Sequence, residues 1–236
     1  MTNRTDDRGL SRRQVMMGLA MGATAFVAGC TTSGSRARIL EGPVGGRLGG
    51  SDPQFQSMYG PIEDEGYLIP AIDPSRVDSM YFRQIVADPT GERPGTVVID
   101  TANYFAYVVQ DGGTAMRYGV GLGRDGFAWS GNAVMQWKRK WPRWTPPAEM
   151  IARQPELEQY REGQEPGLRN PLGARALYLF QNGEDTLYRL HGTPEYWTIG
   201  SSVSSGCVRF MNHDIIDLYE RVPNGSTVVV VQNGMV

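Results

Sequence analysis

Cysteine and histidine are scarce in this chain, and one residue of each kind stands where the two could perform nucleophilic catalysis. The chain has 2 cysteines and 2 histidines, and His191 precedes Cys207 with only residues 192–206 between them. A free thiol has a pKa of about 8.5, so it needs a neighbouring base to react well at neutral pH. An imidazole can take the thiol proton, and the pair could then perform acyl transfer through a thioester.

The residues around Cys207 suit the stabilisation of a charged intermediate. Gly206 permits a tight turn, and the backbone N–H groups of Gly206 and Cys207 are candidate donors to an oxyanion. Ser205 lies in the same loop, and Ser204 is a candidate contact for substrate. Arg209 could pair with a substrate carboxylate or form a structural ion pair, and the sequence leaves both interpretations open.

Short apolar segments rich in β-branched residues follow residue 95 and must position this chemistry. They are residues 96–100, 104–110, 114–122, 133–138, 175–181, 186–191 and 227–232. Asp111-Gly112-Gly113 and Asn182-Gly183-Glu184-Asp185 separate pairs of these segments and predict two β-hairpins. The run of valines in the last segment predicts a strand covered on both faces. The pattern therefore predicts a mainly β domain.

A few helices and one long excursion interrupt the strands. Residues 146–154 and 212–222 have helical composition, with Asn212 as the expected N-cap of the second helix. His213 follows that cap and is expected to face solvent or the helix start. Residues 76–86 are expected to form a short helix. The excursion covers residues 141–173.

The pattern around the two candidate catalytic residues resembles the L,D-transpeptidase family, with its YkuD-type catalytic domain. The resemblance rests on three motifs and extends from about residue 95 to the C-terminus. The motifs are His191-Gly192, Ser204-Ser205-Gly206-Cys207-Val208-Arg209 and Asn170-Pro171-Leu172-Gly173. It implies a mainly β, sandwich-like or barrel-like catalytic domain over residues 95–236 with a few peripheral helices.

The resemblance also implies a mechanism. Cys207 would attack a carbonyl of a peptidoglycan tetrapeptide stem and form a thioester, with His191 as base and the Gly192 carbonyl orienting the imidazole. An amine would then accept the acyl group, whereas water as acceptor would make the protein an L,D-carboxypeptidase. No cofactor is needed, and carbapenem-type inhibitors would acylate Cys207.

One position departs from the family pattern, because Ser205 stands where the family has a second histidine before Gly-Cys. This histidine is not the base, so the departure leaves the role of His191 unchanged. It does keep a second hypothesis open, a lipid-anchored module that binds the cell wall without catalysis. A papain-like protease fits poorly, because there the cysteine comes long before the histidine.

The first thirty residues are typical of an export signal. Arg12-Arg13 lies just before an apolar run that is too short to span a bilayer, and it resembles a twin-arginine signal. Residues 27–30 resemble a lipobox that ends at Cys30, although Ala23-Thr24-Ala25 offers a rival cleavage site. An uncleaved membrane anchor is the third interpretation. Lipidation of Cys30 would anchor the protein in the periplasm, and Thr31 favours the outer membrane.

The composition of the whole chain is that of an ordinary globular protein. A formal net charge of −2 gives no reason to expect nucleic-acid binding. Residues 31–94 are Gly- and Pro-rich and are interpreted as a tether with an ordered end, and Glu63-Asp64-Glu65 as a solvated acidic run. No spacing of histidine, cysteine and acidic residues predicts a metal site.

Four tryptophans lie close together in the sequence. They could form a groove wall beside the catalytic site or pack in the core, and they are Trp129, Trp137, Trp141 and Trp144.

Overall fold

The computed structural model describes residues 50–123, 130–204 and 207–232. All of these residues fall within one compact unit, Gly45–Val236. The predicted export signal, the lipobox and Cys30 lie outside the described residues. Within the described part of the chain, no helix combines the length and apolar character that crossing a bilayer requires.

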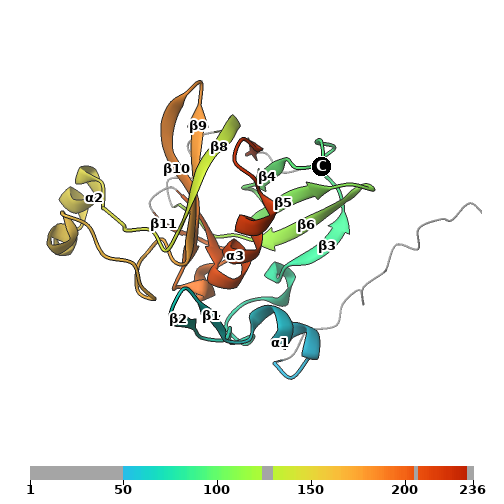
Figure 1. Ribbon diagram of the computed structural model, residues 1–236, viewed down its shortest axis with the longest axis horizontal. Helices are drawn as coiled ribbons and strands as arrows, with labels where there is room; N and C mark the ends of the chain where they lie inside the picture. The colour runs from blue at the N-terminus through green and yellow to red at the C-terminus, as the bar shows by residue number, and fades with distance from the viewer. Residues whose placement is uncertain (1–49, 124–129, 205–206, 233–236) are drawn as a thin grey trace, which may run out of the picture. The chain divides into compact units, whose positions relative to one another are not determined.

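A nine-stranded sheet forms the framework, so the prediction of a mainly β domain is confirmed (Figure 1). Its strands follow the order β12-β10-β9-β8-β13-β4-β5-β6-β3. Their bounds are β3 (Gln84–Ala87), β4 (Val97–Asp100), β5 (Phe105–Gln110), β6 (Thr114–Gly119), β8 (Gly131–Lys140), β9 (Arg175–Gln181), β10 (Glu184–Thr193), β12 (Val208–Met211) and β13 (Thr227–Val231). Most neighbours are antiparallel, but β10 with β12 and β13 with β4 are parallel.

β12, which lies at one edge of this sheet, also forms backbone hydrogen bonds with the segment that follows β6. Gly121 and Arg209 exchange two backbone hydrogen bonds, each 2.9 Å long. The sheet therefore bends back on itself around one apolar core, which includes Tyr118, Met135 and Leu190. A second small sheet pairs β7 (Leu122–Gly123) with β11 (Ser202–Ser204) in parallel.

The two predicted hairpins are present. β5 and β6 are joined at residues 111–113, and β9 and β10 at Asn182-Gly183. Asn182 and Gly183 have φ values of 52° and 83°. Two consecutive positive φ angles are typical of a type I′ turn, whose twist matches that of paired strands. This turn sets the pairing at the start of β10, the strand that carries His191.

Helix α3 (Asn212–Arg221) packs against β9 and β10, and Figure 1 shows it beside these strands. The predicted helix is confirmed, but Asn212 is its first helical residue rather than its N-cap, which is Met211. The prediction that His213 faces solvent is wrong, because His213 is 2% exposed and its Nε2 lies 2.8 Å from the Gly60 carbonyl. In the excursion lie helix α2 (Ala148–Arg153) and the 3₁₀ helix η2 (Pro155–Tyr160).

The lead-in segment before the predicted catalytic domain is structured from residue 50 on. It contains α1 (Pro53–Tyr59), β1 (Ile62–Asp64), β2 (Tyr67–Ile69), the 3₁₀ turn η1 (Ser79–Tyr81) and β3. The helix predicted over residues 76–86 is absent. Asp78 caps only a single 3₁₀ turn, and Gln84–Ala87 extends the edge of the main sheet beside β6. Pairing with the sheet outweighs a weak local helical preference.

The acidic run in this segment is not simply solvated, as the sequence had suggested. Asp64 binds the buried Arg175 guanidinium through two 2.7 Å contacts and accepts a 2.7 Å hydrogen bond from the Trp141 indole. A bidentate arginine–carboxylate pair has a strict geometry. These contacts attach the β1–β2 hairpin to β9.

Tyr59 joins the lead-in segment to α3. Its buried hydroxyl accepts a 2.6 Å hydrogen bond from the Arg83 backbone N–H and donates one of 3.0 Å to Asp214. Tyr59→Phe should lower the free energy of unfolding by about 1–3 kcal/mol, because it leaves buried groups without partners. Urea denaturation measures this loss. Tyr107→Phe is the matched control, since the hydroxyl of buried Tyr107 pairs with none of the described residues; an equal loss in both variants would contradict the assignment.

Candidate active site

Two neighbouring parallel strands, β10 and β12, carry or adjoin the candidate catalytic residues. In the pairing of β10 with β12, Leu190 faces Val208 and His191 faces Arg209. Leu190 and Val208 are fully buried in the main core. Because side chains alternate along a strand, His191 and Arg209 share the opposite face. Cys207 stands immediately before β12.

His191 is buried and held in one orientation. It is 6% exposed, and its Nδ1 lies 2.6 Å from the Gly192 carbonyl oxygen, the contact that the family resemblance implied. Nδ1 therefore carries the proton, and Nε2 is left as the acceptor. Burial lowers the pKa of His191 to about 4, and the nearby Arg209 and Arg189 act in the same direction. Hydrogen bonds to the backbone of Gly192 and Pro171 act against this shift.

Close packing behind His191 explains two glycines. A Cβ on Gly192 would collide with Asn212 Oδ1 and would lie 3.1 Å from the Ala174 nitrogen. Gly173 has a φ of 61°, and a Cβ there would meet the same oxygen and the Gly192 carbonyl carbon at 2.7 Å. Asn212 Oδ1 accepts a 2.9 Å hydrogen bond from the Ala174 N–H. Asn212 thus ties α3 to the turn beside the histidine.

Asn170 fixes the other side of this turn. It is 1% exposed, and its Nδ2 donates to the carbonyls of Pro142, Gln164 and Glu165 at 3.1–3.2 Å. Its Oδ1 accepts a 2.9 Å hydrogen bond from the Leu172 N–H. The Asn-Pro-Leu-Gly motif is therefore a rigid turn that places the Pro171 backbone against His191.

Cys207 lies against an irregular part of β10. Its thiol contacts the Leu187 carbonyl at 3.9 Å, and the cysteine is only partly exposed. The β9–β10 register shifts between Asp185 and Arg189, and Leu187 has a φ of 62°. Bulges of this kind are frequent beside active sites, where they redirect backbone groups. Here the bulge presents a carbonyl to the thiol.

Burial raises the pKa of the Cys207 thiol, while the backbone N–H and the guanidinium of Arg189 act in the opposite direction. Arg189 is itself held by Asp185 through contacts of 2.7 and 2.8 Å. Together with the lowered pKa of His191, this favours the neutral form of both the thiol and the imidazole at neutral pH.

Alkylation of Cys207 by iodoacetamide should therefore accelerate continuously from pH 7 through pH 9. The raised thiol pKa means that the thiolate fraction grows with each step in pH. The rate is measured on a Cys30→Ser variant, in which Cys207 is the sole thiol. A rate that is already constant below pH 7 would indicate a preformed thiolate–imidazolium pair and would contradict this electrostatic description.

Arg209 lies on the same face and is 5% exposed. Its guanidinium forms a 3.5 Å ion pair with Glu195, a side chain that is 57% exposed. Within the described residues, its Nε and Nη2 are buried without a hydrogen-bond partner. The ion pair with Glu195 supports a structural role for Arg209, and the buried N–H groups support a role as donors to an anion.

The remaining predicted residues are only partly described. Ser204 ends β11, whereas Ser205, Gly206 and Trp129 lie outside the described residues. Of the two interpretations of the tryptophans, packing in the core and forming a groove wall, each fits some of those that the structure describes. Trp141 is buried, Trp137 stacks on Tyr178 at 3.5 Å, and Trp144 lines a pocket. Among the described side chains, no three His, Cys, Asp or Glu residues gather as metal ligands.

Comparison with known proteins identifies the domain. The family model of the YkuD L,D-transpeptidase catalytic domain matches residues 94–231. The chain belongs to this family. The YkuD domain is 37% identical over 144 residues to the probable L,D-transpeptidase YbiS of Escherichia coli K12, a match that covers 56% of this chain and 43% of that protein. Against the probable L,D-transpeptidase ErfK/SrfK of the same strain, identity is 32% over 149 residues, or 61% and 46% of the two chains. The chain thus spans less than half the length of these relatives.

Two solved structures are also similar to the YkuD domain. One from Brucella melitensis, described as a probable carnitine operon oxidoreductase, has 49% identity and a TM-score of 0.45 over 63% of this chain and 92% of that one. An L,D-transpeptidase from Mycobacterium smegmatis has 19% identity and a TM-score of 0.43 over 58% of each chain. With TM-scores below 0.5, neither likeness supports an inference about activity.

Proposed function

We propose that this protein is a peptidoglycan L,D-transpeptidase that transfers an acyl group through a thioester on Cys207. The observation that supports this most directly is the hydrogen bond from His191 Nδ1 to the Gly192 carbonyl. This tautomer leaves Nε2 unprotonated in the neutral ring. A buried, neutral imidazole with a fixed tautomer is suited to act as a general base.

In the first step, Cys207 Sγ attacks the carbonyl carbon of the third residue of a tetrapeptide stem, and His191 Nε2 takes the thiol proton. The negative charge moves to the carbonyl oxygen, where the backbone N–H groups of Gly206 and Cys207 are the proposed donors. The C–N bond to the terminal D-alanine then breaks, and the imidazolium returns the proton to the departing amine. The product on the enzyme is a thioester.

In the second step, an amine attacks the thioester carbonyl. His191 removes a proton from the incoming nitrogen, and the thiolate leaves and is reprotonated. The new amide joins the third residue of the donor stem to the acceptor. If water takes the place of the amine, the same steps make the protein an L,D-carboxypeptidase.

The charges around the site suit an anionic substrate. Arg189 and Arg209 both lower the pKa of His191, so they create a positive potential at the catalytic face. The Nε and Nη2 of Arg209, which have no hydrogen-bond partner among the described residues, are the proposed donors to a stem carboxylate. Ser204 and Ser205 are proposed to line the same loop and to supply hydroxyl groups.

We also propose that the protein is an exported lipoprotein. The supporting observation is sequence alone, the Arg12-Arg13 pair, the apolar run and Cys30 at its end. Lipidation of Cys30 would anchor the domain to the periplasmic face of the outer membrane, next to its peptidoglycan substrate. Mass spectrometry of the mature N-terminus tests this, because Cys30→Ser should abolish the lipid mass and release the protein from membranes.

Product analysis tests the proposed reaction. The protein is incubated with a tetrapeptide-stem muropeptide, with and without a second muropeptide whose third residue carries a free amine. A cross-linked dimer with release of D-alanine is the expected product. A tripeptide stem alone would support the carboxypeptidase, and binding of the muropeptide without any release of D-alanine would support the non-catalytic module.

A further inference from the structure

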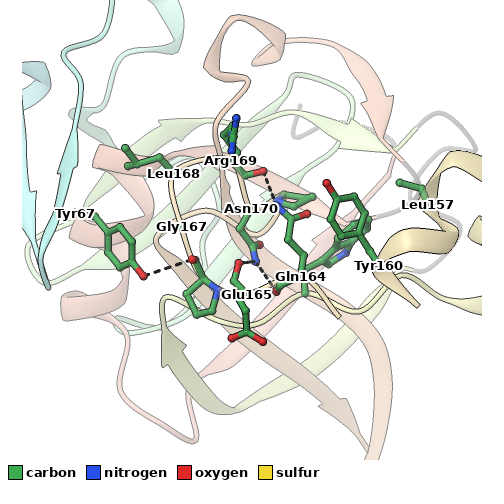
Figure 2. Close-up of a pocket in the computed structure, with 12 residues that line it drawn as sticks. Tyr67, Leu157, Tyr160, Gln164, Glu165, Gly167, Leu168, Arg169 and Asn170 are labelled. Atoms are coloured by element: carbon green, nitrogen blue, oxygen red, sulfur yellow. Dashed lines mark hydrogen bonds between the residues drawn. The ribbon is translucent and has the colours of Figure 1, made fainter. Parts of the chain in front are cut away.

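A pocket of about 870 Å³ is lined mainly by residues of the excursion. Tyr67 of β2 contributes one wall, and Trp144 and Tyr160 of the excursion contribute another. Figure 2 shows Tyr67 and Leu168 on one side of it and Leu157 and Tyr160 on the other. Tyr67 precedes the part of the chain that the family model matches, so this wall is an addition to the catalytic domain.

The pocket borders the active site through one residue. Pro171 lines it, and the Pro171 backbone is also a hydrogen-bond partner of His191. Asn170, which fixes the same turn, lines the pocket too. A molecule in the pocket would therefore contact the turn whose backbone bonds to His191.

The aromatic side chains of the pocket walls are held in place by contacts with the protein, yet they stay partly exposed. Trp144 is held by two backbone hydrogen bonds with Gln164, and its ring lies 6.1 Å from that of Tyr160 at an angle of 56°. The Tyr67 hydroxyl contacts the Pro166 carbonyl at 3.4 Å. Tyr67 and Trp144 both remain only partly covered. Partly exposed aromatic rings in a concave site are typical of ligand pockets.

We propose that this pocket binds a neutral N-acetylated sugar ring of the glycan strand that bears the donor stem. This inference rests on the proposed function. The face of an aromatic ring is electron-rich and attracts the polarised C–H groups on the flat side of a pyranose. Rings on the walls of the pocket offer such faces.

The charges of the pocket favour a sugar over a stem peptide. A stem peptide carries carboxylates and a free amine, which need partners of opposite charge. Glu165 lines the pocket, but its carboxylate is already paired with Arg143 at 2.9 Å. Arg169 is the remaining charged side chain of the lining, and a single cation does not match both the carboxylates and the amine of a stem peptide.

Two matched substrates test the proposal, a disaccharide-tetrapeptide and the free tetrapeptide of the same sequence. The wild-type protein should have the higher kcat/KM on the disaccharide-tetrapeptide. Trp144→Ala and Tyr160→Ala should each lower that value by roughly tenfold, the size expected for truncating an aromatic anchor, and leave the free tetrapeptide unchanged. Trp144→Phe, which keeps a ring face, should restore most of the preference.

A binding measurement separates this proposal from the proposed function. Di-N-acetylchitobiose carries no peptide, so isothermal titration calorimetry can follow its binding to the wild-type protein and to each variant without turnover. Saturable binding that Trp144→Phe retains and Tyr160→Ala weakens is expected, even if no stem peptide is ever cleaved. Absence of binding, or equal losses on both tetrapeptide substrates in folded variants, would overturn the sugar site and favour a peptide site.

Discussion

Replacing His191 with glutamine should lower kcat by about 10²–10⁴-fold, the range that a general base contributes. Glutamine can keep a hydrogen bond to the Gly192 carbonyl, but its amide cannot take a proton from the Cys207 thiol. Wild-type activity should also fall as the pH approaches the His191 pKa of about 4, since the base is then protonated. Steady-state release of D-alanine across a pH series measures both effects.

The second histidine supplies the control for this variant. His213 is buried on α3 and bonds to Gly60, away from the strand pair that holds the catalytic face. His213→Gln should reduce stability without removing activity from the folded fraction, as urea denaturation and active-site titration can show. If the two variants lost the same activity per folded molecule, His191 would have no role as a base.

Replacing Gly192 with alanine should damage both stability and catalysis. The added Cβ would displace Asn212 Oδ1 and leave the buried Ala174 N–H without its acceptor. Overpacking and the lost hydrogen bond together predict a loss of about 2–6 kcal/mol in the free energy of unfolding. The same shift would move the carbonyl that orients His191. Urea denaturation and kcat, each measured at a temperature where the variant is folded, report the two effects.

Gly50 offers a matched substitution for comparison. It has no positive φ, and an added Cβ would meet only Pro74, at 3.4 and 3.8 Å, which is ordinary contact. Gly50→Ala should therefore leave stability and kcat within experimental error of the wild type. A Gly192→Ala protein as stable and active as Gly50→Ala would show that the packing behind His191 is not required.

The local pattern of the sequence predicts much of the sheet. Hydrophobic alternation and turn residues suffice for the hairpin at Asn182-Gly183 and for the strand that carries His191. These features depend on neighbours in sequence, so a single chain reveals them. The family resemblance adds the pairing of His191 with Gly192, which the structure contains as a 2.6 Å contact.

The errors all concern contacts between residues distant in sequence. Asn212 has the composition of a helix cap, but its side chain accepts from Ala174, 38 residues earlier. His213 and Asp64 look solvated until Gly60 and Arg175 are placed beside them. The pocket joins Tyr67 to the excursion, and no periodicity connects those segments. Partners of this kind become visible only once the chain is folded.

Intact-protein mass spectrometry tests the central claim most directly. The Cys30→Ser protein and its Cys207→Ala derivative are each incubated with a tetrapeptide-stem muropeptide or a carbapenem. If Cys207 is the nucleophile, the first protein should gain the mass of one acyl group, which peptide mapping assigns to Cys207, and the second should gain none. A folded protein that binds the muropeptide but never gains mass, or an adduct that persists in Cys207→Ala, would contradict the proposed mechanism.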